Sequence, residues 1–178
     1  MKYILIIFLL FIFCLPAGAQ KLVAAKPARL QIFVQKTDGG DLMMNSETLF
    51  VSYDQLKMTG ELMFNTLTTE NELLRNLLDS VLYDRITFSG LVPEGKFVFQ
   101  NTLNEKFIVE TDIVYGDHQS RILINYNVSN RVTSSSNAFE ISCTGSISLH
   151  DDLGVTHETG LQDKISFQFF QNVSSRQY

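Results

Sequence analysis

The stretch Glu61–Gly90, ELMFNTLTTENELLRNLLDSVLYDRITFSG, changes its hydrophobic period twice. Apolar and polar residues alternate near Leu62 and again near Phe88, which predicts a β-strand at each end of the stretch. Between them apolar residues recur at helical spacing, which predicts a helix over Thr69–Leu82. A single helix therefore interrupts a chain that is otherwise patterned as β-strands.

The sequence also predicts how this helix begins and which side it buries. Thr69 can cap the amino end, and Glu72, three residues later, would complete a capping box. One half of the helix surface is apolar, and we expect Leu73 and Leu77 at its centre. The apolar half comprises Leu73, Leu74, Leu77, Leu78, Val81 and Leu82. Because such a surface needs an apolar partner, we expect the helix to lie as a lid on a curved sheet.

Short alternating segments along the rest of the chain predict further strands. The segment Gln20–Ala28 is polar and is most simply a lead-in, and Gly60 is a candidate for a β-bulge or a bend. The expected strands are Leu30–Val34, Thr48–Tyr53, Leu56–Phe64, Arg85–Ser89, Lys96–Asn101, Phe107–Val114, Ile122–Val128, Phe139–Leu149 and Ile165–Phe169. Eight or nine short strands with one helix predict a mainly β fold, an antiparallel eight-stranded barrel with one amphipathic helix inserted between strands.

Residues 1–19 have the pattern of a signal peptide. Lys2 is followed by an apolar run and then by Ala17-Gly18-Ala19, a small-x-small cleavage signal. We therefore expect export to the periplasm or the extracellular space, and one domain over residues 20–178. A retained membrane anchor is the alternative, and lipidation at Cys14 is disfavoured because a Leu-Pro pair follows the cysteine.

Charge and cysteine content exclude several classes of protein. A formal net charge of −5 argues against nucleic-acid binding, which needs a clustered basic face. Cleavage after residue 19 leaves Cys143 as the one cysteine, so no intramolecular disulfide forms. Cys143 lies on an apolar strand face, which favours a core role over a reactive thiol. No phosphate-binding glycine loop is present, and no cofactor is expected.

The strongest candidate for catalytic chemistry is a group of polar residues late in the chain. His150, Asp151, Asp152, His157 and Glu158 could in principle bind a divalent ion. A metal-dependent hydrolase would use His150, Asp152 and His157. Their spacing matches no metal-binding pattern on a helix or on paired strands, so a solvated turn is favoured. We expect neither a catalytic residue nor a metal site.

Two segments carry a family resemblance. The run LDSVLYDRITFSG, which ends at Gly90, and SISLHDDLGV, Ser146–Val155, resemble the middle and the late strand-turn of YceI-like proteins. The resemblance implies a lipocalin-type barrel around an isoprenoid-like lipid, with no enzymatic activity. It implies an apolar small molecule as partner, an isoprenoid or fatty acid, and is compatible with transient membrane contact.

Large apolar residues in the alternating strands can form either a filled core or a pocket wall. The resemblance favours the pocket wall, with Leu73 and Leu77 contributed by the lid. The expected ligand-binding residues are Phe64, Leu73, Leu77, Phe88, Phe97, Phe99, Ile122, Ile124, Phe139, Ile141, Phe167 and Phe169. The alternative is a filled barrel that acts as an interaction or stress-response module without a ligand.

Overall fold

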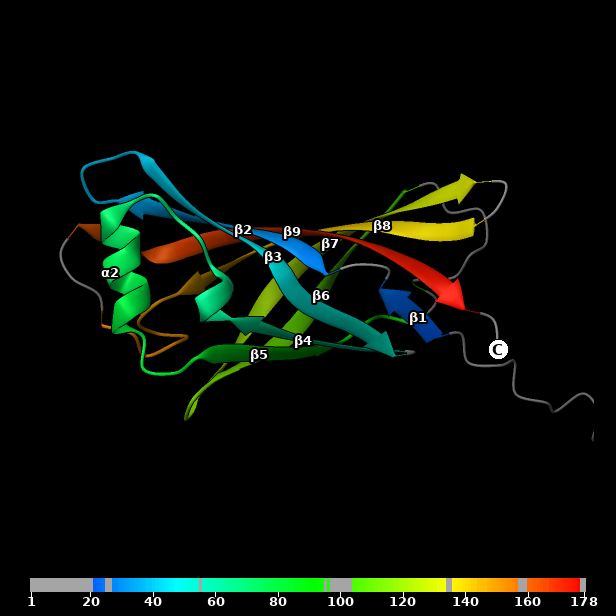
Figure 1. Cartoon of the computed structure of the whole chain (residues 1–178). Helices are drawn as coiled ribbons and strands as arrows, with labels where there is room; N and C mark the ends of the chain where they lie inside the picture. Colours follow the sequence, from blue (N-terminus) through cyan, green and yellow to red (C-terminus); the bar gives the residue numbers. More distant parts are fainter. Residues whose placement is uncertain are drawn as a thin grey trace, which may run out of the picture.

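The computed structural model describes residues 21–24, 27–54, 56–94, 96, 104–133, 136–156 and 160–176 (Figure 1). The predicted signal peptide and the predicted strand residues 97–101 lie outside this described part. The elements in chain order are β1 (Lys21–Ala24), β2 (Ala28–Lys36), β3 (Asp41–Asp54), β4 (Lys57–Met63), the 3₁₀ helix η1 (Phe64–Thr66), α2 (Glu72–Ser80), β5 (Arg85–Leu91), β6 (Asn104–Tyr115), β7 (His118–Thr133), β8 (Ser136–Ser148) and β9 (Leu161–Arg176).

Eight of the strands close into a ring. The hydrogen-bonded order is β2-β9-β8-β7-β6-β5-β4-β3, and β3 pairs again with β2 to complete the circle. Every neighbouring pair is antiparallel. The predicted eight-stranded antiparallel barrel with one inserted helix is therefore confirmed.

The strand β1 corrects the expectation that Gln20–Ala28 is only a lead-in. It pairs with both β3 and β9, through Leu22 opposite Tyr53 and Lys21 opposite Arg176. It thus fills the gap between β3 and β9 beyond the start of β2, and supplies partners for backbone groups there. Four residues are too few to show a period in the sequence, which explains why the pattern missed this strand.

A β-bulge explains why the sequence predicted only the second half of β3. Ala28 pairs with Leu49, and Leu30 pairs with Ser46, so β3 contains one extra residue between these two pairs. The inward-facing positions of β3 consequently change from even-numbered to odd-numbered residues, so the strand as a whole shows no continuous alternation in the sequence. The bulge predicted at Gly60 is wrong, because the pairing of β4 with both neighbours is regular through that residue.

The helix α2 begins later than predicted. Asn71 is its cap, and the Asn71 side-chain oxygen accepts hydrogen bonds from the backbone nitrogens of Leu73 (3.0 Å) and Leu74 (3.4 Å). The Thr69 hydroxyl instead donates to the Met43 carbonyl in β3 (3.0 Å). Glu72 is the first helical residue, so the predicted capping box does not form.

The helix stands across one end of the barrel, where β2 ends and β9 begins, and β9 ends at the opposite end (Figure 1). Leu74 and Leu77 are buried in the core. Leu73 is 40% exposed, so the expectation that it lies at the centre of the buried face is wrong. Its side chain lies at the edge of that face, because the helix is turned toward Leu74. The lid-like position of the helix agrees with the prediction.

Contacts at both flanks hold the helix in place. Before the helix, Thr68 forms a two-way backbone pair with Asn45 of β3. After the helix, the Tyr115 hydroxyl accepts from the backbone nitrogens of Leu82 (3.0 Å) and Tyr83 (3.3 Å). The helix is therefore bound at its two ends to different walls of the barrel.

Candidate functional site: an apolar cavity under the helix

The barrel contains a cavity of about 70 Å³ with an entirely apolar lining. All eight strands of the ring contribute to it. The lining residues are Leu30, Ile32, Leu49, Leu62, Ile86, Phe88, Ile113, Ile122, Ile124, Ile147, Ile165, Phe167 and Phe169.

The cavity lies in the half of the barrel that α2 covers. Leu62 is next to the last residue of β4, Ile86 is the second residue of β5, and Ile147 is next to the last residue of β8. These strand ends belong to the end of the barrel across which the helix stands (Figure 1). The cavity and the buried helix residues Leu74 and Leu77 are part of one continuous apolar cluster.

Among the described residues, large side chains pack against one another in the other half of the interior. The Tyr126 ring stacks on Phe107, with centroids 5.2 Å apart, and meets Phe169 edge-on. The Tyr126 hydroxyl donates to the Met58 sulfur at 2.7 Å. Phe139 is also buried here and does not line the cavity. The barrel thus has an open apolar half under the helix and a packed half beyond Phe169.

Three weak acids lie in the packed half. Burial raises the pKa of Tyr53, Tyr126 and Cys143 well above their ordinary values. Tyr53 and Cys143 both lie close enough to Tyr126 to raise its pKa further by electrostatic interaction. All three are consequently neutral at pH 7, and the thiol is a core group as the sequence predicted.

The twelve predicted ligand-binding residues lie in several different environments. Five of them line the cavity: Phe88, Ile122, Ile124, Phe167 and Phe169. Ile141 is buried beside Phe139 in the packed half, and Phe64 contacts the Tyr115 ring edge-on. Leu77 is buried beneath the helix, whereas Leu73 is exposed. Phe97 and Phe99 lie outside the described residues. Ligand contact stays a prediction for all twelve.

Sequence reasoning missed eight of the lining residues. These are Leu30, Ile32, Leu49, Leu62, Ile86, Ile113, Ile147 and Ile165. All of them lie on inward strand faces, so the period of two contained the necessary signal. The prediction favoured phenylalanine over isoleucine and leucine, although the cavity wall is mostly aliphatic.

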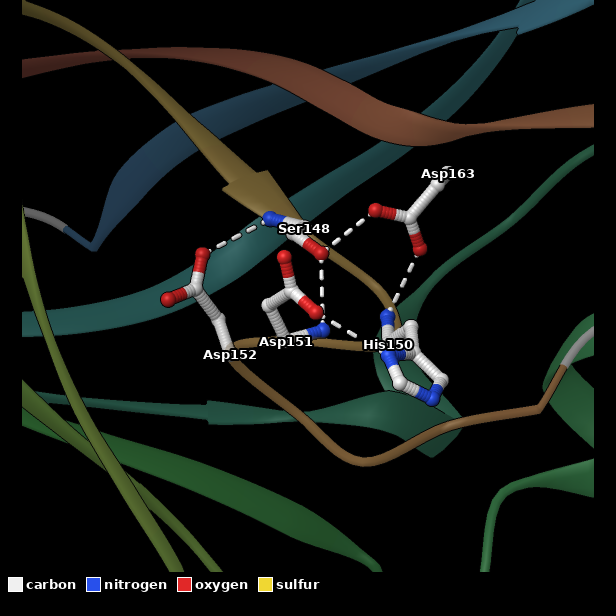
Figure 2. A network of polar contacts seen from close by, with 5 residues as sticks. All are labelled: Ser148, His150, Asp151, Asp152 and Asp163. Carbon is white, nitrogen blue, oxygen red and sulfur yellow. Dashed lines mark hydrogen bonds and ion pairs between the residues drawn. The ribbon is translucent and has the colours of Figure 1, made fainter.

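The polar residues around His150 hold a turn (Figure 2). The Asp152 carboxylate accepts from the Ser148 backbone nitrogen at 2.8 Å. The Asp163 carboxylate accepts from the His150 backbone nitrogen at 2.7 Å and from the Ser148 hydroxyl. Asp151 pairs with the His150 ring at 3.0 Å, and this hydrogen bond raises the pKa of His150. The turn after β8 thus uses these carboxylates as hydrogen-bond acceptors.

The described residues include no group of three or more His, Cys, Asp or Glu side chains placed to hold a metal ion. His157, which the hydrolase alternative invoked, and Glu158, named for the possible metal site, lie outside the described residues. Within the described part, no helix is both long and apolar enough to span a membrane.

Two solved structures share the architecture. A polyisoprenoid binding domain from Saccharophagus degradans, implicated in plant cell wall breakdown, has a TM-score of 0.65 and 13% identity, over 89% of this chain and 99% of that one. Burkholderia cenocepacia BcnA has a TM-score of 0.57 and 9% identity, over 82% of this chain and 95% of its own. The chain has the YceI-like fold. No family model matches the sequence, and no curated protein matches it.

The family resemblance in Glu61–Gly90 and Ser146–Val155 implied this architecture, and the structure confirms it. The barrel ring, the helix between β4 and β5, and the turn after β8 occur where the resemblance places them. At such low identity the likeness shows the fold alone.

Proposed function

We propose that the chain is a non-catalytic carrier that holds one long apolar molecule, an isoprenoid-like or fatty acyl chain, in the barrel beneath α2. The observation that carries this proposal is the cavity, to which every strand of the ring contributes apolar side chains. The polyisoprenoid-binding activity of the Saccharophagus degradans domain supports the same class of ligand.

The lining also indicates how such a ligand would be oriented. A polar head group placed among these thirteen apolar residues would lose its hydrogen bonds to water without finding partners. The hydrocarbon tail therefore enters the barrel, and the polar end stays at the mouth. Burying about ten methylenes at about 0.8 kcal/mol each gives about 8 kcal/mol, which corresponds to roughly micromolar binding before ordering costs.

The volume of the cavity sets a condition on binding. It is about 70 Å³, whereas ligand pockets usually enclose about 300–1,000 Å³. A long chain therefore needs more room than this conformation contains. Since α2 covers this end of the barrel and packs on it through Leu74 and Leu77, we propose that the helix lifts from the barrel end to admit the chain.

Mass spectrometry of an organic extract of the purified protein tests the carrier function. We expect a hydrocarbon-chain lipid at close to one molecule per protein. After delipidation, the fluorescence of cis-parinaric acid should rise on binding and fall when an unlabelled fatty acid is added. A lipid-free extract together with no parinarate binding would contradict the proposal.

A second function, a filled-barrel interaction module, is favoured by the packed half of the interior and by the small cavity. It predicts that fatty acids leave the melting temperature of the delipidated protein unchanged. The carrier function instead predicts a concentration-dependent rise, because a ligand that binds the folded state stabilises it. A thermal melt with and without fatty acid distinguishes the two.

We further propose that residues 1–19 direct export to the periplasm or the extracellular space. Amino-terminal sequencing of the mature protein should then begin at Gln20. A mature chain that still begins at Met1 would contradict cleavage.

A further inference from the structure

Two glycines lie beside phenylalanines that line the cavity. Gly60 of β4 is directly opposite Phe88 of β5, and Gly145 of β8 is directly opposite Phe167 of β9. Neither glycine has a positive φ, so the backbone conformation does not require glycine at either position. The reason for glycine must be space.

That space is occupied by the two aromatic rings. A methyl group built on Gly60 would overlap three atoms of the Phe88 ring, and one built on Gly145 would overlap the outer atoms of the Phe167 ring. Each ring therefore lies over the neighbouring strand, against the barrel wall, where any other residue would have its Cβ atom.

The two pairs lie on opposite walls of the barrel. In the ring order, β5 and β9 are separated by β6, β7 and β8 on one side and by β4, β3 and β2 on the other. The same holds for β4 and β8. Since both rings line the same cavity, they flank it from opposite sides.

We propose that Gly60 and Gly145 set the width of the cavity between the Phe88 and Phe167 rings, which we call the ligand channel. By letting Phe88 and Phe167 lie against the wall, the glycines keep the space between the rings open for a single hydrocarbon chain. This inference rests on the proposed carrier function, and it assigns the specificity for a thin chain to two residues that touch no ligand themselves.

The test uses Gly60→Ala, which forces the Phe88 ring off the wall and into the cavity. We expect cis-parinaric acid to bind the delipidated variant about tenfold more weakly, or worse, because a lost fit of this size in an apolar pocket has that effect. The double variant Gly60→Ala/Phe88→Leu should recover binding, since leucine has no ring to displace. Gly145→Ala and Gly145→Ala/Phe167→Leu should behave in the same way.

Thr59→Ala is the matched control. Thr59 precedes Gly60 on β4 but is exposed on the outer face, so its truncation should leave the parinarate affinity unchanged. The inference is overturned if Gly60→Ala melts like the wild type and binds parinarate equally well. It is also overturned if the double variant regains the wild-type melting temperature without regaining affinity.

Xenon uptake measures the space between the rings without lipid binding, so it tests the width assignment even if the protein binds no lipid. Dry apolar cavities take up xenon, so xenon should shift the methyl NMR signals of Ile122 and Ile165 in the wild type. We expect those shifts to be lost in Gly60→Ala and restored in Gly60→Ala/Phe88→Leu. Wild-type protein that takes up xenon but no parinarate would contradict the carrier function alone. Equal xenon shifts in the wild type and Gly60→Ala would contradict the width assignment.

Discussion

Burial raises the pKa of Tyr53, Tyr126 and Cys143, and this has a consequence for stability at alkaline pH. In the unfolded chain a cysteine loses its proton near pH 8.5 and a tyrosine near pH 10. The folded protein keeps these protons longer, so between the unfolded and folded pKa values the unfolded state binds fewer protons. The contribution of these three groups to the free energy of unfolding is therefore complete below about pH 8.5. It is lost as the pH rises through their raised folded-state pKa values.

We accordingly expect the free energy of unfolding, measured in urea, to fall steadily from about pH 8.5 upward. Tyr126→Phe removes one of the three groups and should flatten that decline. In the native protein at pH 8, Cys143 should react with Ellman's reagent far more slowly than in urea. Rapid native reaction would show that the thiol is accessible and would contradict the buried assignment.

The helix cap gives a second prediction for single residues. Asn71→Ala removes the acceptor for two backbone nitrogens and should lower the free energy of unfolding by about 1 kcal/mol. Thr69→Ala removes the bond that its hydroxyl donates to the Met43 carbonyl (3.0 Å) and the bond it accepts from the Asn71 backbone nitrogen (3.2 Å). It should cost less, because the Asn71 cap on Leu73 and Leu74 stays intact. Urea titrations of the two variants compare them directly. An equal or larger loss of stability in Thr69→Ala would indicate that Thr69 is the helix cap, as the sequence pattern predicted.

At the scale of elements, the question is whether α2 is a lid that can undock or an ordinary part of the core. Leu77 is buried under α2, whereas Leu82, beyond its end, is 87% exposed. Leu77→Asp places an unpaired charge in the apolar cluster, so the helix should undock. If α2 is a lid, the variant loses bound parinarate while its melting temperature falls only modestly, because the strand ring still pairs. Leu82→Asp is the control and should retain both properties. A collapse of the whole fold in Leu77→Asp would indicate ordinary core.

Elements were predictable from the sequence wherever one periodic pattern ran unbroken. The faces of β6, β7 and β8 follow the period of two, and the helix is found within its predicted range. The bulge in β3 broke the pattern, and β1 was too short to have one. The cavity lining was harder to predict, because it depends on which side chains meet across the ring. Gly60 and Gly145 show this, since their effect is exerted on residues of neighbouring strands.

For the whole molecule, the division of the interior into an open and a packed half matters most. Folded interiors normally leave few voids larger than a water molecule. Among the described residues, the cavity beneath α2 lies next to a half of the interior that contains stacked rings and a hydrogen-bonded tyrosine. This contrast indicates a selective loss of packing at one end. Stability can rest on the packed half while the open half accommodates a ligand.

Matched substitutions in the two halves test this division. Ile165 lines the cavity, and Ile141 is fully buried in the packed half. Ile141→Phe should cost about 1–3 kcal/mol of folding free energy, because extra volume in a packed core forces strain. Ile165→Phe should cost less than about 1 kcal/mol, because the cavity can take up the added atoms. The same filling should weaken parinarate binding to Ile165→Phe, whereas folded Ile141→Phe should bind normally. Equal stability losses at the two sites would show that the interior is uniformly packed, and would remove the physical basis for a ligand chamber beneath the helix.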